Sequence, residues 1–170
     1  MSSQDPDICK EEVYYSFYEK HSKDLFNFLY YKFGEQHNPA DVVQEAFIKL
    51  WQNCKQVILE KAKSFLFTVA NNHMLNEISK AKTRKDYAAI KPKDYTHESP
   101  DFIMEETEYG ERLTEAINSL SEDMRATFLL NRIEGKKHQE IADMLGISKK
   151  AVEKRIYKAL ALIREKVEGI

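Results

Sequence analysis

The chain of 170 residues contains little of what turns, disulfide frameworks and membrane spans require. It has only 5 glycines and 4 prolines, which favours an all-helical fold with few turns. Its 2 cysteines, Cys9 and Cys54, show no CxxC or Cys/His spacing, so we expect neither a disulfide framework nor a zinc site. No apolar run approaches the roughly 20 residues of a membrane helix, and the first residues lack a signal peptide's apolar stretch. We therefore expect a cytoplasmic protein.

Net charge is also nearly absent, because 26 Lys+Arg and 28 Asp+Glu leave a formal total of -2. This balance conceals segments of opposite sign. Residues 61–93 hold 8 basic and 2 acidic side chains and residues 136–170 hold 9 and 5, whereas residues 94–123 hold 1 and 10 and residues 1–60 hold 6 and 10. Two basic segments separated by an acidic one indicate two surfaces for a polyanion, joined by a connector that avoids it.

In the first half, apolar residues recur every three or four positions from about Lys10 to Phe33, which predicts one or two helices that end at Gly34. Asn38 can cap a second helix, with Pro39 in its first position. We expect that helix to run to about residue 51. It should bury Val43, Ala46, Phe47 and Leu50 and expose Asp41, Gln44, Glu45 and Lys49.

A loop is predicted over residues 53–61, followed by a helix from Ser64 to Lys80 or beyond that buries Phe65, Leu66, Val69 and Ala70. No helical pattern persists from Thr83 to about Glu105, where prolines and polar residues are typical of a linker. We therefore predict two small helical domains, 1–86 and 108–170, joined by a linker over 87–107.

The C-terminal segment has the pattern of a helix-turn-helix. Leu113, Ile117 and Leu120 mark one helix, and Ser121 caps a second that is closed by Gly135. A short helix then runs from His138 to Leu145 with Ile141, Ala142 and Leu145 inward, although Lys137 is a poor residue for its N-cap. Gly146 supplies the turn, Ile147 fills the joint, Ser148 caps the last helix, and Val152, Ile156, Ala159, Ile163 and Val167 face the core.

Basic side chains lie on or beside the free faces of that last helix, where they suit phosphate and base-edge contacts in a major groove: Lys149, Lys150, Lys154, Arg155 and Lys158. Glu153 can accept a hydrogen bond from a cytosine amino group or simply pair with Lys149. The alternative is an ordinary helical hairpin whose lysines are only solvated.

A second set of polar residues interrupts the apolar pattern of the third predicted helix: Asn71, Asn72, His73 and Asn76, followed by Lys80, Lys82, Arg84 and Lys85. Amides, an imidazole and nearby aromatic rings are suited to unpaired bases. On composition alone a solvated helix end is the more common explanation. His73 and Glu77 stand one turn apart, but two such residues are more often a surface pair than metal ligands.

The segments ADVVQEAFIKLW, SFLFTVANNHMLNEISKAK and LTEAINSLSEDMRATFLLNRIEGKKHQEIADMLGISKKAVEKRIYKAL, in this order, resemble the extracytoplasmic-function (ECF) group of sigma factors. The resemblance covers residues 10–85 and 108–168. It implies a two-domain initiation factor without catalytic chemistry or cofactor, whose partners are core RNA polymerase, promoter DNA and, usually, an anti-sigma factor.

Carried over by position, the resemblance makes Asp41, Gln44 and Glu45, flanked by Lys49, the face that binds core polymerase. It implies that the 53–61 loop holds a flipped-out base of the minus-ten element. The neighbouring bases of that element would be read by residues of the following helix: Asn72, His73, Asn76, Lys80, Lys82 and Arg84. The last helix, from Ser148 and Lys149 through Glu153 to Lys158, corresponds to the reader of the minus-thirty-five element.

Three alternatives remain at this stage. A stand-alone helix-turn-helix regulator would bind a palindrome tightly without polymerase. A helical interaction module would tolerate loss of the lysines in the last helix. An enzyme is disfavoured, since the chain has no phosphate-binding glycine loop, HExxH motif or nucleophile elbow.

Overall fold

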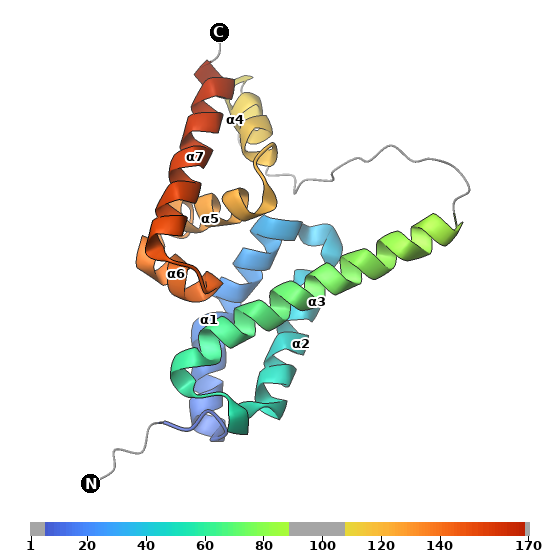
Figure 1. Cartoon of the computed structure of the whole chain (residues 1–170), viewed down its shortest axis with the longest axis vertical. Helices are drawn as coiled ribbons and strands as arrows, with labels where there is room; N and C mark the ends of the chain where they lie inside the picture. Colours follow the sequence, from blue (N-terminus) through green and yellow to red (C-terminus); the bar gives the residue numbers. More distant parts are fainter. Residues whose placement is uncertain (1–5, 89–107, 169–170) are drawn as a thin grey trace. The chain divides into compact units, whose positions relative to one another are not determined.

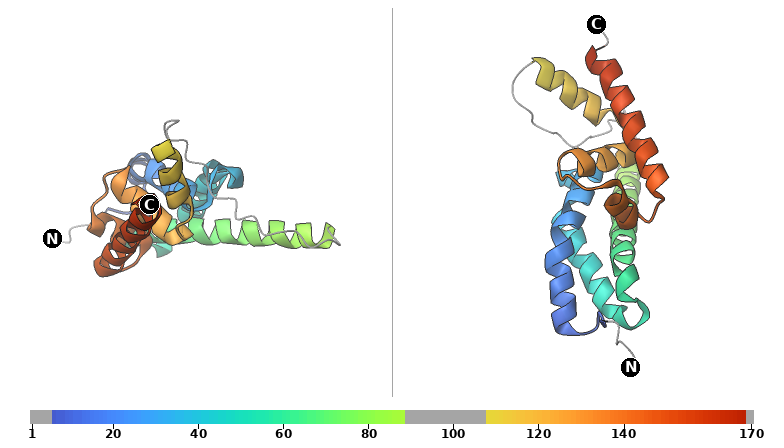
Figure 2. Two further views of the ribbon diagram at one scale, coloured as in Figure 1. Left: turned by 90° about the horizontal axis from the view of Figure 1, so that it is seen from above. Right: turned by 90° about the vertical axis from the view of Figure 1, so that its left-hand side faces the viewer.

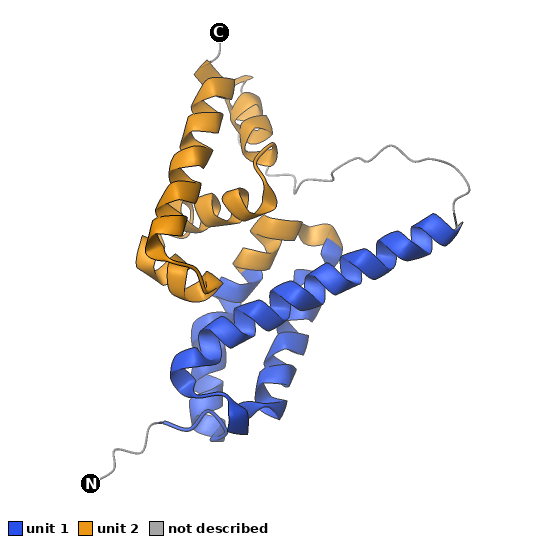
Figure 3. Cartoon of the chain, viewed as in Figure 1, with its two compact units in different colours: residues 1–26, 37–98 blue, residues 27–36, 99–170 orange. Residues whose placement is uncertain are grey.

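A computed structural model describes residues 6–88 and 108–168, which are helical and contain no β-strand within those ranges. This confirms the all-α prediction. The chain divides into two compact units, one of residues 1–26 and 37–98 and the other of residues 27–36 and 99–170 (Figure 3). The expected boundaries at residues 86 and 108 stay predictions, and most of the expected linker lies outside the described residues. No described helix is both long and apolar enough to cross a membrane.

The first unit contains the N-terminal part of α1 (Glu11–Phe33), then α2 (Pro39–Gln52) and α3 (Leu59–Ala88), with the short 3-10 helix η2 (Cys54–Gln56) between α2 and α3 (Figure 1). Another 3-10 helix, η1 (Glu35–His37), lies between α1 and α2, where the chain passes from the second unit back to the first. The predicted apolar face of α2 is confirmed, and Val42 is buried as well. α3 packs along α2 and buries Ala62, Leu66, Phe67, Ala70 and Met74. Phe65 and Val69, expected in the core, are only half-buried.

Aromatic rings join α1 to α2. The ring of Phe47 lies 6.3 Å from that of Phe17, in an edge-on arrangement. The Tyr14 ring lies 4.8 Å from the Trp51 ring, and its hydroxyl donates a hydrogen bond to the Phe47 carbonyl at 2.7 Å. Edge-on aromatic pairs stabilise beyond the area they bury. The helical hairpin therefore has its own non-covalent core.

Three local predictions for this unit are wrong. Asn38 occupies the N-cap of α2 with a left-handed backbone (φ 49°), but its side chain makes no capping hydrogen bond. Asparagine tolerates this conformation, which turns the chain without a cap. α3 begins at Leu59, inside the expected loop, and continues to Ala88, past Thr83. Its last turns have no apolar stripe because they are exposed on every side, and their Ala, Lys and Arg residues favour a helix.

The expectation of no disulfide is also wrong. Cys9 and Cys54 are bonded to each other, with their Cα atoms 5.2 Å apart at a sequence separation of 45. Short-range spacing rules cannot detect this pair, because the packing of α1 against α2 brings the two cysteines together.

The second unit contains α4 (Glu108–Asn118), α5 (Glu122–Arg132), α6 (His138–Leu145) and α7 (Lys149–Glu168), together with the end of α1. α7 packs against each of the other three helices, and α4 lies beside its C-terminal part (Figures 1 and 2). Ala159 and Ile163 of α7 are buried, as are Ala116 and Ile117 of α4. α7 is thus the central element of this unit.

The helix-turn-helix prediction is confirmed in its geometry. α6 spans the expected residues, Gly146 ends it in a left-handed conformation (φ 64°), and the Ser148 hydroxyl accepts a hydrogen bond from the Ala151 amide at 3.1 Å. Lys137 indeed offers no capping acceptor, and instead the Glu140 carboxylate accepts from the Lys137 amide at 2.7 Å. Met144 is fully buried, whereas Leu145, predicted to face inward, is half-exposed.

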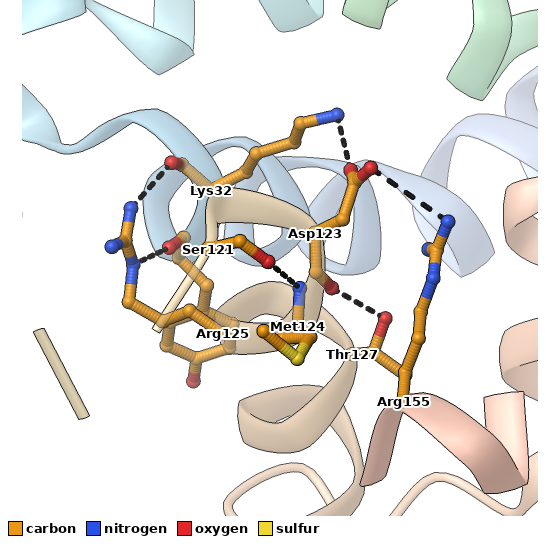
Figure 4. Close-up of polar contacts among 8 residues, drawn as sticks. Lys32, Ser121, Asp123, Met124, Arg125, Thr127 and Arg155 are labelled. Carbon is orange, nitrogen blue, oxygen red and sulfur yellow. Dashed lines mark hydrogen bonds and ion pairs between the residues drawn. The ribbon is translucent and has the colours of Figure 1, made fainter. Parts of the chain in front are cut away.

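Arg125 is buried in this unit, with only 4% of its surface exposed. Its guanidinium donates to the carbonyls of Tyr31 at 2.9 Å and Lys32 at 2.8 Å, at the end of α1 (Figure 4). It also donates to the carbonyls of Asn118 and Leu120, both at 3.4 Å. The last carbonyls of a helix lack partners within the helix and carry its negative dipole end, so a buried cation is well placed there.

A phenol–carboxylate contact lies near this cluster. The Tyr31 hydroxyl donates to the Glu134 carboxylate beyond the end of α5. Burial, and next this hydrogen bond, hold the pKa of Tyr31 well above its ordinary value. Tyr31 therefore stays protonated at neutral pH and remains a donor.

We expect Arg125→Ala to lower the free energy of unfolding of the second unit by about 2–4 kcal/mol, because several buried carbonyls lose their donor. Arg125→Lys should recover only part of this, since an ammonium cannot span the same acceptors. The measurement is native-state hydrogen exchange of α5 and α7 amides, which reports this unit separately.

The control for this substitution is Arg112→Ala, which removes only an exposed i,i+4 ion pair with Glu108 and should change stability by less than about 1 kcal/mol. Equal small effects of the Arg112 and Arg125 substitutions would show that the buried guanidinium contributes little.

Candidate nucleic-acid interface

The free face of α7 carries exposed cations. Lys149, Lys150, Lys154 and Lys158 are all exposed, while Val152 and Ile156 between them are buried. The helix begins directly after the Gly146 turn and its Ser148 cap, so the fold presents its N-terminal turns outward. In helix-turn-helix proteins this part of the second helix contacts base edges in the major groove.

Glu153 is not a free acceptor on this surface. Its Oε1 lies 4.0 Å from the Lys149 Nζ and 3.6 Å from the His138 Nδ1. The pairing with Lys149 is one of the two roles that the sequence left open. Contact with a base would have to exchange with these partners, and the His138 contact is ionic only when the imidazole is protonated.

Arg155 differs from the neighbouring lysines because it is half-buried and engaged. Its Nη2 lies 3.7 Å from the Asp123 Oδ2, while the Lys32 Nζ lies 2.8 Å from Oδ1 of the same carboxylate (Figure 4). Burial raises the pKa of Asp123, but the Lys32 hydrogen bond and the charges of Lys32 and Arg155 outweigh it and leave that pKa below its usual value. Arg155 thus has a structural partner within its own unit.

The second predicted surface lies on α3 of the first unit. Asn72, Asn76, Lys80, Lys82 and Arg84 are all exposed, and His73 is half-buried. Lys80 forms an ion pair with Glu77 at 3.2 Å, and this hydrogen bond lowers the pKa of the Glu77 carboxyl. In the described part of the chain, His73 and Glu77 belong to no group of three or more potential metal ligands.

The predicted polymerase-binding face lies on α2. Asp41, Gln44 and Glu45 are exposed there, whereas Lys49 is half-buried and its Nζ lies 3.4 Å from the His73 Nδ1. With that nitrogen as acceptor, the ammonium donates to the imidazole. The contact connects the α2 face with the α3 surface, a link that helical periodicity within single segments could not reveal.

Two apolar side chains near η2 were not among the predicted site residues. Trp51 is 43% exposed at the end of α2, and Ile58 is 58% exposed just before α3. Exposed aromatic and apolar groups beside a basic helix are the surfaces on which unpaired bases stack. The only tryptophan of the chain, next to the predicted loop, was the signal in the sequence that could have identified this position.

Comparison with known proteins assigns both units. The family description "Sigma-70 region 2" matches residues 17–84, and "Sigma-70, region 4" matches residues 110–163. The chain belongs to the sigma-70 family of transcription initiation factors. Within that family it is an ECF sigma factor.

Curated relatives support this placement. The chain is 26% identical to the ECF RNA polymerase sigma factor SigE of Mycolicibacterium smegmatis, over 86% of this chain and 58% of that protein. It is 27% identical to the ECF RNA polymerase sigma factor SigL of Mycobacterium tuberculosis, over 86% of this chain and 84% of the relative. The chain thus spans little more than half the length of the first of these proteins.

The fold also matches a solved structure. The sigma factor RpoE of Bartonella quintana, crystallised in complex with the anti-sigma factor NepR, superposes with a TM-score of 0.62 at 17% identity, covering 92% of this chain and 98% of that one. At this identity the similarity supports the fold.

The pKa of Asp123 leads to a pH prediction. A carboxyl whose pKa is lower in the folded state stabilises that state above its unfolded pKa, about 3.9, and loses this contribution as pH falls through the folded value. Wild type should therefore be more stable than Asp123→Asn near pH 7, and the difference should vanish in acid. Because the side chain is 53% exposed, we expect less than about 1 kcal/mol.

Thermal unfolding of both proteins between pH 3 and pH 7 measures this difference. Glu165→Gln, at an exposed position of α7, is the matched control. A gap between wild type and Asp123→Asn that persists unchanged at pH 3 would contradict the assignment.

Proposed function

We propose that the chain binds core RNA polymerase through Asp41, Gln44, Glu45 and Lys49 of α2 and recognises promoter DNA with two separate basic surfaces. The exposed residues of α3, from Asn72 to Arg84, contact the minus-ten element. The α7 surface, from Ser148 to Lys158, contacts the minus-thirty-five element. The protein acts on polymerase in the cytoplasm, and its chemistry is binding rather than catalysis.

The observation that carries this proposal is the distribution of exposed charge. Cations are exposed on α3 of one unit and on α7 of the other, whereas α2 exposes two carboxylates and an amide. Phosphate contacts hold a protein on DNA, so two cationic helices on different units suit two promoter elements. The acidic face of α2 suits a protein partner, since it would repel DNA.

Opening of the duplex is assisted by base capture. Unstacking costs about 1.4 kcal/mol per base-pair step, and a base stacked on protein returns about 1–3 kcal/mol. The 53–61 segment, with exposed Ile58 and nearby Trp51, supplies apolar surface for such a base. Captured bases would therefore bias the promoter toward the open state.

An anti-sigma factor is a further proposed partner. A structure similar in fold, the sigma factor RpoE of Bartonella quintana, was crystallised in complex with the anti-sigma factor NepR. Such a partner would compete for the surfaces that bind polymerase or DNA.

Reconstitution with core RNA polymerase tests the central proposal. Wild type should co-purify with core enzyme and support promoter-dependent transcription, and Gln44→Ala and Glu45→Ala should each weaken core binding about three- to tenfold by removing an interfacial hydrogen bond. Glu12→Ala, which removes a carboxylate from an exposed position of α1, should bind as wild type does. Absence of both co-purification and transcription for wild type would refute the proposal.

Lys154→Ala tests the α7 surface. Loss of one phosphate contact should weaken binding to minus-thirty-five duplex about three- to tenfold and lower the slope of log K against log salt by about one. Lys166→Ala removes the same charge from the last turn of α7 and should cost less than about twofold. Titration by fluorescence anisotropy at several salt concentrations gives both quantities. Equal losses for the two variants would indicate a nonspecific field of charge instead of a defined interface.

A further inference from the structure

The Cys9–Cys54 bond closes the ends of the α1–α2 hairpin of the first unit. Cys9 lies in the turn before α1, and Cys54 is the first residue of η2, directly after α2. Both helices lie between them in sequence. The bond therefore ties the start of the chain to the segment that leads into α3.

Non-covalent contacts hold the two cysteines near each other independently of the bond. Ile8 is 1% exposed, and the Cys9 amide donates to the Asp7 Oδ1 at 2.9 Å. On the other side, the Asn53 side chain donates to the Lys49 carbonyl at 2.7 Å and holds the start of η2. The aromatic contacts of Tyr14 complete the hairpin. These contacts are expected to keep the fold, and the proximity of the two sulfurs, when the bond is reduced.

Both cysteines are also accessible, because each is only partly buried. Small oxidants and thiols can therefore reach them. Under the proposed function the protein works in a reducing compartment, where protein disulfides are usually transient and redox-sensing, not permanent structural bonds. A pair of cysteines held close together but accessible there is suited to reversible oxidation.

Because of the position of the disulfide, oxidation would affect the 53–61 segment. η2 is followed at once by Val57 and Ile58 and then by α3, so the bond anchors the 53–61 segment to the N-terminal turn. A cross-link removes conformational freedom from the segments it joins. Without it, the Asn53 hydrogen bond is an anchor that remains at the start of the segment.

We propose that Cys9 and Cys54 form a reversible redox modification site, oxidised by hydrogen peroxide, that orders the 53–61 segment and so strengthens capture of an unpaired promoter base. One thiolate attacks the peroxide oxygen and becomes a sulfenic acid, releasing the first water. The second sulfur attacks the sulfenic sulfur, forming the disulfide and releasing the other water. The two thiols lose two electrons and two protons, and dithiothreitol returns them. The effect on promoter capture rests on the proposed function.

The first test counts thiols in the full chain. After reduction, maleimide should label two cysteines. After treatment with hydrogen peroxide, maleimide should label none, and the mass of the disulfide-linked peptides should be lower by two hydrogens. Dithiothreitol should then restore both labelling sites. Cys9→Ser and Cys54→Ser should each keep one thiol that cannot form the internal bond. The proposed redox site would be refuted if both thiols were still labelled after peroxide treatment, or if dithiothreitol could not reduce the oxidised product.

The second test measures order in the segment by hydrogen exchange, without DNA or polymerase. Amides of residues 55–61 should exchange about threefold or more slowly in the oxidised wild type than in the reduced one. Cys54→Ser should exchange at the reduced rate under both conditions. Equal exchange in the two states of wild type would refute ordering by the bond.

The third test measures open complexes formed with core polymerase on a promoter selected from a random DNA library. The oxidised protein should give roughly twofold to tenfold more open complex than the reduced protein. The disulfide has already ordered the 53–61 segment, so less conformational entropy is lost when the base binds. Cys54→Ser should show no such difference. Equal yields for wild type would refute the effect on capture, whereas no open complex in either state would refute the proposed function and leave the redox site to the first two tests.

Discussion

The second unit depends on a buried cation that has no buried carboxylate beside it among the residues that the structure describes. Arg125 is 4% exposed, and burial lowers its pKa, yet it donates to carbonyls from α1 and from the segment between α4 and α5. A guanidinium has donors in a fixed plane, so all of these carbonyls must keep their positions for it to be satisfied. One side chain thereby aligns the end of α1, the start of α5 and, through α5, the packing surface of α7.

Basic residues in this protein fall into two groups that a charge count cannot separate. Arg125 and Arg155 are engaged inside the second unit, the first with carbonyls and the second with Asp123. The lysines of α7 remain on the surface. Because Arg155 is engaged with Asp123, the cationic surface of α7 is smaller than the number of basic residues in 136–170 indicates.

Features set by neighbouring residues were predictable, and features set by tertiary contacts were not. The Gly146 turn and the Ser148 cap follow from local backbone and hydrogen-bonding preferences, and both are present. The Cys9–Cys54 bond and the Lys49–His73 contact join distant segments, which periodicity does not relate. Exposure of the candidate site residues was largely predictable from the apolar stripes, and the pairing of Glu153 with Lys149 one turn earlier was one of the predicted roles. Ionic partners that come from other helices were not predictable. Arg155 shows this difference, because its place in the sequence beside the exposed lysines of α7 gives no sign of its contact with Asp123.

Small helical units have limited apolar cores, so cross-links have a large effect on them. In the second unit, hydrogen bonds from Arg125 join the helices, and oxidation does not affect them. In the first unit the cross-link is a disulfide at the end of an aromatic hairpin. A permanent set of contacts thus supports the helix-turn-helix, which under the proposed function would read a preformed duplex and benefit from rigidity. The disulfide, reversible under our proposal, lies beside the segment that would capture a base during melting, where order could be adjusted without unfolding the hairpin core.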